Sequence, residues 1–499
     1  MPSFLRRPLA VTLAIIAFYV ALALLRANTT YPWNDEAWYS SPAWSLIHRG
    51  NTGTPILEET HNFWRGINTW TYWVPPLHFY VQVPWYLVLG FSLMTARLLA
   101  MSWGLVALLA WGGIVWKLTA NRATALLAML LMACDYQFVS QVSLARVDAM
   151  AVAFAALGIL AYVHFRERNL AAAVLLSQTA VVLCGISHPT PGVPAFATVA
   201  FLTLYYDRKR IGWRHLLLAA IPYIAGAAGW GLYVSIAPEY FKAQFFGNVA
   251  DMDRLSGFKR PWIAFAREFD RYAGMAGFSP GLNPLYRIKA VVIALYAIAT
   301  GALFLNGQTR RDPRIRPFLL LWAVLFMAMT VYDYTKEVRY GLQIVAVYDA
   351  LLAIFAVRLW AKSGPAAMIA VSAFMAVSLG GILYTSLFQD AYHRSYLPMT
   401  NYLKTEAKPG DLIFAGSETG FALGFDGNVI DDRNFGYYTG KVPDWLVLGT
   451  SATDEMVRRR WAANPEYQYL TRLLESRFCK VQSFPQFEVY SRRCGDVRR

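Results

Sequence analysis

Long apolar runs separated by short basic clusters constrain this chain more than any other feature. Eleven runs are long and apolar enough to cross the hydrocarbon core of a bilayer, which takes about 20 residues of helix. Only 15% of the residues are charged, well below the usual share in a soluble domain. We therefore predict a polytopic α-helical membrane protein with about 11 transmembrane helices. The predicted spans are 8–27, 93–116, 123–142, 148–164, 170–188, 191–206, 215–235, 288–306, 317–333, 340–358 and 364–387.

The distribution of Lys and Arg predicts which side of the membrane each loop faces. If the segment 73–91, rich in proline and aromatic residues, stays in the interface, sixteen basic residues fall in cytoplasmic loops and three in short outer loops. If 73–91 crossed, five would be cytoplasmic and fourteen outside, against the positive-inside tendency. We therefore predict a multi-pass protein of the inner or plasma membrane with a cytoplasmic amino end. The scattered positions of the +15 net charge argue against a nucleic-acid partner.

The pattern changes near residue 398, where short β-like runs begin to alternate with helical ones. We predict a transmembrane domain over 1–397, whose outer loop 28–92 carries interfacial helices. Residues 398–499 are predicted to form a small extracytoplasmic (periplasmic) α/β domain. A hairpin turning near Pro485 would bring Cys479 and Cys494 to opposite positions, which in an oxidising compartment allows a disulfide.

Two adjacent acids, Asp35 and Glu36, directly follow the first span in "PWNDEAWYSS". A helix is expected here, with Asn34 as its cap, both acids in its first turn, Gly50 at its end and an aromatic face on the membrane. Two interpretations stay open for the acids. They could simply favour the helix dipole, or one of them could be a general base whose pKa is raised by its neighbour and by partial burial.

Further polar residues lie at the outer ends of other predicted spans. An arginine and an acid in "ARVD" fit either a local ion pair or part of the same site, and a histidine in "SHPT" fits either a hydrogen bond at the interface or a ligand contact. A lysine and an arginine in "KEVRY" could clamp a phosphate or merely reach toward the interface. An acid within a span is either functional or held by a buried hydrogen bond. These residues are Arg146 and Asp148, His188, Lys336 and Arg339, and Asp349.

Taken in order, these motifs resemble those of GT-C fold integral membrane glycosyltransferases. The resemblance is to the protein-mannosyltransferase-like group (glycosyltransferase family 39-like), which includes the aminoarabinose transferases of lipid A. It covers nearly the whole chain and rests on the acidic pair, "PPLHFY" (75–80), "ARVD" (145–148), "HPT" (188–190) and "KEVRY" (336–340). One departure is that Trp73 and Val74 stand where aminoarabinose transferases have a Glu-Lys pair. Another is Asp349, where the group usually has an apolar residue or proline.

The resemblance implies transfer of a sugar from a polyprenyl-phosphate donor to a lipid, glycan or protein acceptor on the outer face. It implies that Asp35 is the catalytic base with Glu36 beside it, and that Asp148 is a second acid that organises the site, with a divalent metal as a conceivable cofactor. The negative charge that grows on the leaving phosphate would be met by cations. The candidate donor-phosphate residues are Arg339, Tyr340, Lys336, Arg146 and His188.

Two other classes of protein remain as alternatives. A secondary transporter of a lipid-linked or small polar substrate predicts inverted repeats, broken helices and a polar site at the membrane midplane. Apart from Asp349 the spans show little of this, and a transporter has no evident use for the tail of about 100 residues. In a membrane scaffold, the acids would only cap helices.

Overall fold

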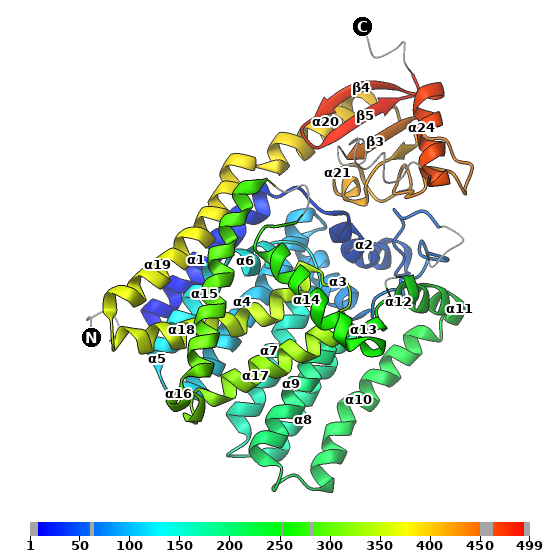
Figure 1. Ribbon diagram of the computed structural model, residues 1–499. Helices are drawn as coiled ribbons and strands as arrows, with labels where there is room; N and C mark the ends of the chain where they lie inside the picture. The colour runs from blue at the N-terminus through cyan, green and yellow to red at the C-terminus, as the bar shows by residue number, and fades with distance from the viewer. Residues whose placement is uncertain (1–7, 60–63, 252, 280–282, 450–462, 494–499) are drawn as a thin grey trace.

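A bundle of long helices carries a small α/β domain at one end (Figure 1). The computed structural model describes residues 8–59, 64–251, 253–279, 283–449 and 463–493. Each predicted span coincides with a helix or a pair of consecutive helices. The bundle elements are α1 (Pro8–Thr29), α4 (Leu93–Thr119), α5 (Arg122–Cys134), α6 (Tyr136–Val142), α7 (Asp148–Phe165), α8 (Leu170–Ser187), α9 (Pro189–Asp207), α10 (Trp213–Val234), η3 (Pro284–Lys289), α15 (Ala290–Leu305), α16 (Gly307–Arg311), α17 (Arg316–Tyr332), η4 (Val338–Gly341), α18 (Leu342–Trp360) and α19 (Gly364–Leu383).

The number of clear spans is smaller than predicted. Within the described part of the chain, eight helices are long and apolar enough to cross a membrane, and nine if the bent pair α5 and α6 counts as one span. The two remaining predicted spans are α9 and α17, which pack against each other. α17 has only 17 residues, and α9 contains three prolines in its first six residues. By length and composition, eight or nine of the eleven predicted spans are therefore candidates, and all eleven segments are helical.

Short helices lie between the bundle and the C-terminal domain. Segment 73–91 contains α3 (Leu77–Leu89), whose 13 residues are too few to span a bilayer, as predicted. Its last turn exposes Leu87, Val88 and Leu89. The other short elements are α2 (Asn34–Arg49), α11 (Pro238–Phe241), η2 (Lys242–Phe246), α12 (Gly247–Asp251), α13 (Ser256–Lys259) and α14 (Pro261–Met275).

Helix α2 differs from its prediction in two respects. Its N-cap is Trp33 rather than Asn34, and the Glu36 carboxylate accepts the Trp33 backbone N–H at 2.9 Å, as the third helical residue of a capping box does. Its end at Gly50, in the left-handed conformation, is as predicted. The aromatic face was expected on the membrane, but Trp38 and Trp44 are buried in contacts with other parts of the protein.

A five-stranded mixed sheet forms the C-terminal domain, in the order β2-β1-β3-β5-β4. β1 pairs in parallel with β2 and β3, whereas β3, β5 and β4 are antiparallel. β4 and β5 form the hairpin predicted around Pro485. Cys479 is disulfide-bonded, and its predicted partner Cys494 lies outside the described residues. The elements are β1 (Ile413–Phe414), η7 (Ser417–Thr419), α21 (Gly420–Leu423), β2 (Val429–Ile430), β3 (Trp445–Gly449), α24 (Pro465–Arg477), β4 (Cys479–Phe484) and β5 (Phe487–Ser491).

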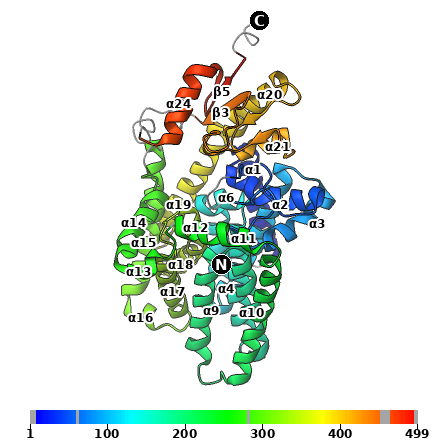
Figure 2. The same ribbon diagram turned by 90° about the vertical axis from the view of Figure 1, so that its right-hand side faces the viewer.

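One helical run joins the bundle to this domain. From α19 it continues through two π-helical segments, η5 (Tyr384–Gln389) and η6 (Tyr392–Tyr396), into α20 (Leu397–Glu406). Figure 2 shows the sheet beyond the end of this run and close to α2. Ala37 and Trp44 of α2 share an apolar core with α20 and with residues of β1, β3 and β5. The C-terminal domain is therefore packed directly on the helix that carries Asp35 and Glu36.

Candidate functional site

Asp35 lies between two arginines that are distant in sequence. Its Oδ2 accepts a hydrogen bond from Arg339 Nη1 at 3.0 Å and another from Arg146 Nη1. Arg146 Nε also donates to Asp148 Oδ2 at 2.8 Å, so one guanidinium bridges both acids. Arg146 and Asp148 are almost fully buried, whereas the side chains of Asp35 and Arg339 keep 15% and 18% exposure. The Asp35–Arg339 pair is therefore the end of the cluster that a substrate can reach.

Aromatic rings surround these cations. The guanidinium carbons of Arg339 and Arg146 lie 4.9 and 5.5 Å from the centre of the Trp33 ring, and Arg146 is 5.3 Å from the Tyr39 ring. Such contacts attract a cation and exclude water, which strengthens the electrostatic interactions of the cluster. Trp33 immediately precedes α2, so the start of this helix supplies both the acid and one wall of the site.

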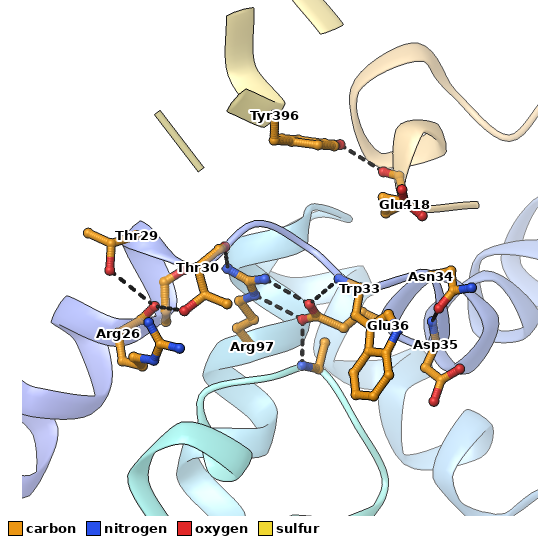
Figure 3. Close-up of polar contacts among 12 residues, drawn as sticks. Arg26, Thr29, Thr30, Trp33, Asn34, Asp35, Glu36, Arg97, Tyr396 and Glu418 are labelled. Carbon is orange, nitrogen blue, oxygen red and sulfur yellow. Dashed lines mark hydrogen bonds and ion pairs between the residues drawn. The ribbon is translucent and has the colours of Figure 1, made fainter. Parts of the chain in front are cut away.

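Glu36 has a different role from its neighbour (Figure 3). It is fully buried, and Arg97 donates to its two oxygens at 2.8 and 2.7 Å. The backbone N–H groups of Trp33 and Ala145 donate to the same carboxylate at 2.9 and 2.7 Å. With four donors already bound, Glu36 has little capacity to accept a substrate proton. Its geometry favours positioning α2 and the Arg146 segment rather than the predicted catalytic role.

Arg97 was not among the predicted site residues. It lies in the first turns of α4, has no exposed surface, and its Nη1 also donates to the carbonyls of Ala27 and Thr30, at and just beyond the end of α1. A cation is favoured at the C-terminal end of a helix. A signal was present in the sequence, since an arginine in the apolar run "MTARLLAM" is costly without a partner.

His188 and Tyr340 lie on the buried side of the cluster. Their ring centres are 5.5 Å apart, and the Tyr340 ring is 5.6 Å from the guanidinium carbon of Arg339. Burial lowers the pKa of His188 to about 4, although nearby Asp148 opposes the shift, so this imidazole is neutral at pH 7. The predicted donor-phosphate residues Arg339, Tyr340, Arg146 and His188 are thus close together in space.

Two further polar residues beside the cluster were also missed. His78 of "PPLHFY" is buried, its ring meets Tyr39 edge-on, and burial lowers its pKa to about 3. Neither of its nitrogens has a hydrogen-bond partner among the residues described. Arg254, from the segment between α12 and α13, interacts with Tyr340. The motif containing His78 was noted in the sequence, whereas nothing local distinguishes Arg254 from other loop arginines.

Lys336 is placed away from the cluster. Its ammonium group donates to Glu268 Oε2 at 2.7 Å and to the Thr330 carbonyl at 2.6 Å. Glu268 also binds Arg271, which in turn pairs with Asp333. Lys336 therefore belongs to a buried ion-pair network that anchors α14 to the loop before η4. The structure does not place it where the predicted donor-phosphate site requires it.

A cavity of about 400 Å³ lies against Trp33 and residues of the C-terminal domain. Burial raises the pKa of Glu418 to about 8, and the charge of Asp431 adds to this effect. Glu418 Oε2 has no hydrogen-bond partner in the described part of the chain. The cavity is mixed in character, with aromatic, amide and carboxyl groups. Its polar and aromatic lining includes Tyr31, Trp33, Asn34, Glu418, Asp431 and Gln486.

The arrangement of acids does not form a metal site. Among the described residues, no three side chains of His, Cys, Asp or Glu are grouped closely enough to hold an ion. Asp35 and Asp148 are instead joined by the Arg146 guanidinium, which occupies the position that a shared cation would take.

Part of the chain matches a known protein family. Residues 66–243, which include "PPLHFY" and "ARVD", match the family model described as dolichyl-phosphate-mannose-protein mannosyltransferase. The chain carries a protein-mannosyltransferase family domain. This result confirms the resemblance and the predicted enzyme class, a membrane glycosyltransferase, and it favours an enzyme over the transporter and scaffold alternatives. No curated protein sequence matches the chain.

Solved structures show the same fold. ArnT from Cupriavidus metallidurans bound to undecaprenyl phosphate superposes with a TM-score of 0.64 at 12% identity, covering 97% of this chain and 98% of that one. Its apo form gives a TM-score of 0.62 at 12% identity, with 96% and 97% covered. The oligosaccharyltransferase AglB from Archaeoglobus fulgidus, in complex with an inhibitory peptide and a dolichol-phosphate, gives 0.53 at 12% identity, with 95% and 74% covered. The predicted GT-C fold is confirmed.

Proposed function

We propose that this protein transfers a sugar from a polyprenyl-phosphate donor to a hydroxyl group of an acceptor at the outer face of the membrane. The observation that carries the proposal is the Asp35 carboxylate held by Arg339 and Arg146 at the partly exposed edge of a buried polar cluster. The family domain and the lipid phosphates bound by ArnT and AglB support such a donor.

The reaction needs a base at the acceptor hydroxyl and a cation at the leaving phosphate, and the site has a carboxylate and arginines for these two roles. The acceptor oxygen forms a bond to the anomeric carbon and gives its proton to Asp35, while the bond from that carbon to the phosphate oxygen breaks. The electron pair of this bond stays on the phosphate, where the Arg339 guanidinium stabilises the growing negative charge. Asp148 keeps Arg146 in place and has no direct part in proton transfer.

Arg339 cannot bind a phosphate fully while it is paired with Asp35. We infer that the donor phosphate draws Arg339 away from Asp35, because a phosphate accepts two guanidinium hydrogen bonds and carries more charge. Asp35 then keeps Arg146 as its cation, and the oxygen lone pair that Arg339 leaves can accept the acceptor hydroxyl. This exchange ties the access of the acceptor to Asp35 to the arrival of the donor.

The acceptor is proposed to enter through the cavity beside the C-terminal domain. Trp33 lines this cavity, and its ring also contacts the guanidinium groups of Arg146 and Arg339, so the cavity and the cation cluster are adjacent at this residue. Sugars stack on aromatic rings and bind carboxyl and amide groups, which suits a hydroxyl-bearing acceptor. The outer location of the site rests on the charge distribution of the short loops, which puts 28–92 and the C-terminal domain on the side opposite the sixteen basic residues of the predicted cytoplasmic loops.

Binding of undecaprenyl phosphate to the purified protein tests the donor assignment without knowledge of the sugar. We expect Arg339→Ala to weaken binding by about 10- to 100-fold, the value of a charged hydrogen bond of about 1.5–3 kcal/mol. Asp35→Asn should bind at least as tightly as wild type, because it removes the competing carboxylate. Arg358→Ala is a matched control, since Arg358 also pairs with a single aspartate, Asp312, at 3.1 Å. Unchanged binding by Arg339→Ala would overturn the proposed donor site.

A further inference from the structure

Asp135 and Asp349 lie close together in the interior of the bundle, away from the candidate active site. Asp135 separates α5 from α6, where the helix axis turns by 62°, and Asp349 lies within α18. Both side chains are buried, with residue exposures of 2% and 1%. Tyr296 of α15 lies between them, its hydroxyl oxygen 3.0 Å from Asp135 Oδ2 and 2.8 Å from Asp349 Oδ1. Three helical segments thus meet at one hydroxyl group.

The two contacts of the Tyr296 hydroxyl show how many protons Asp135, Tyr296 and Asp349 share. A tyrosine hydroxyl has one hydrogen and can donate to only one of two carboxylates. The second short contact therefore requires a proton on a carboxyl group, which then donates to the Tyr296 oxygen. Two unprotonated carboxylates at these distances would also place two negative charges in a buried site, which is very costly.

The surrounding contacts show which carboxyl group holds the proton. Asp135 Oδ1 accepts the backbone N–H of Phe138 at 2.7 Å, as the N-cap of α6, and such donors favour an ionised carboxylate. Asp349 Oδ2 has no hydrogen-bond partner among the described residues, which would be costly for a charged group but is tolerable for a neutral acid. The proton therefore belongs on Asp349.

The remaining groups near the pair are consistent with a single negative charge. Lys289 lines the same small cavity as Asp135 and Tyr296, of about 20 Å³, enough for one water molecule, and its ammonium group lies 4.6 Å from the Tyr136 ring centre. The Ser378 hydroxyl of α19 also lines it and has no partner within the part of the chain described. One lysine thus offsets one ionised aspartate. The other titratable groups around the pair are Cys134, Tyr136 and Tyr348, whereas Arg26 interacts with Lys289 and Tyr136 rather than with either aspartate.

We propose that Asp349, Tyr296 and Asp135 form a one-proton site, in which neutral Asp349 donates to Tyr296 and Tyr296 donates to ionised Asp135. Asp349 is then a positioning residue. It holds the break between α5 and α6 against α15 and α18. Gln137, in the first turn of α6, donates to the Val338 carbonyl at 3.0 Å, next to Arg339. The one-proton site therefore supports the segment that carries the donor-phosphate arginine, a consequence that rests on the proposed function.

Infrared spectroscopy of the purified full-length protein at neutral pH tests the proton directly. A neutral carboxylic acid has a C=O stretching band that an ionised carboxylate lacks. We expect Asp349→Asn to remove one such band, and the control Asp312→Asn to remove none, because Asp312 is partly exposed and paired with Arg358. If Asp349→Asn fails to fold, Tyr296→Phe serves instead. This variant should keep the band at a shifted frequency because the acid loses its acceptor.

A wild-type spectrum from which neither variant removes or shifts an acid band would overturn the proposal. A second result would also overturn the proposal: added Na⁺ at fixed pH raises the melting temperature of the wild type but not that of Asp349→Asn. This result would show that a cation, rather than a proton, is bound at the site. A comparison of two variants separates a role of Asp349 in hydrogen bonding to Tyr296 from a role in filling space. Asp349→Asn can still donate to Tyr296 and should keep wild-type affinity for undecaprenyl phosphate, whereas Asp349→Ala should lose affinity several-fold. Loss of the acid band in Asp349→Asn, together with equal affinities of Asp349→Asn and Asp349→Ala for undecaprenyl phosphate, would refute only the link to the donor site.

Discussion

Replacing Glu36 with glutamine probes the contacts that fix the start of α2. Glu36 accepts two hydrogen bonds from Arg97 and two from the backbone, and both partners of the ion pair are almost completely buried. Glutamine has one acceptor oxygen, so its NH₂ group would face at least one of these donors. It would also leave the Arg97 charge buried without a counter-ion. Breaking a buried pair in this way costs about 3–5 kcal/mol.

Unfolding of the detergent-solubilised protein by SDS, followed by tryptophan fluorescence, measures this cost. We expect Glu36→Gln to lower the free energy of unfolding by about 3–5 kcal/mol, and Arg97→Met in the same chain to restore part of it by removing the uncompensated charge. Glu167→Gln is the matched control, because Glu167 pairs with Arg166 but is 80% exposed, and its unfolding midpoint should not change. Transfer activity of Glu36→Gln, measured per folded molecule, should stay close to wild type.

Two results would refute this reasoning. A loss of less than about 1 kcal/mol in Glu36→Gln would show that the contacts of Arg97 with the α1 carbonyls are sufficient by themselves. A complete loss of transfer by folded Glu36→Gln would instead return Glu36 to the catalytic role expected from the sequence.

Three other substitutions test different parts of the structure. Asp35→Asn should reduce sugar transfer by about 10²- to 10⁴-fold while leaving folding and membrane insertion unchanged, as measured by glycan analysis of cells that express the variant; near-normal transfer would exclude Asp35 as the base. Lys336→Met should lower the melting temperature, because it breaks a buried pair with Glu268, and leave undecaprenyl phosphate affinity unchanged; weakened binding without destabilisation would return Lys336 to the donor site. Glu418 has a folded pKa of about 8, above its ordinary 4.5, so its contribution to stability is complete below pH 4.5 and declines as the pH rises to about 8. Glu418→Gln should therefore raise the melting temperature more at pH 8 than at pH 5, and an equal shift at both would contradict the raised pKa.

The features that the sequence predicted well are those set by local pattern. Apolar runs marked all the long helices of the bundle, and the turn at Pro485 marked the hairpin of β4 and β5. The gathering of Asp35, Arg146, Asp148 and Arg339 could also be predicted, because topology alone placed their loops on one side.

The features that it missed depend on contacts between distant segments. Glu36 and Arg97 are separated by 61 positions, and no spacing rule relates them. Lys336 and Arg339 looked equivalent in a short loop, yet Lys336 has a left-handed backbone (φ 59°) and its side chain reaches Glu268 instead. The aromatic face of α2 suited a membrane surface as well as a protein interface, and only the packing of the C-terminal sheet on it distinguishes the two.

The two π-helical segments between α19 and α20 determine how the C-terminal domain faces the rest of the protein. A π turn contains one residue more than an α turn, and each residue in a helix advances the following chain by about 100° around the axis. Deleting one residue from η5 or η6 would turn everything after it by that angle. The Ser417 hydroxyl, which accepts the Trp38 indole N–H at 2.6 Å, would then face away from α2. Single extra residues far from Asp35 thus set the rotation of the C-terminal domain about the helix axis, and with it the residues that this domain contributes to the cavity proposed for the acceptor. Relatives that differ in length at 384–396 should line this cavity with different residues.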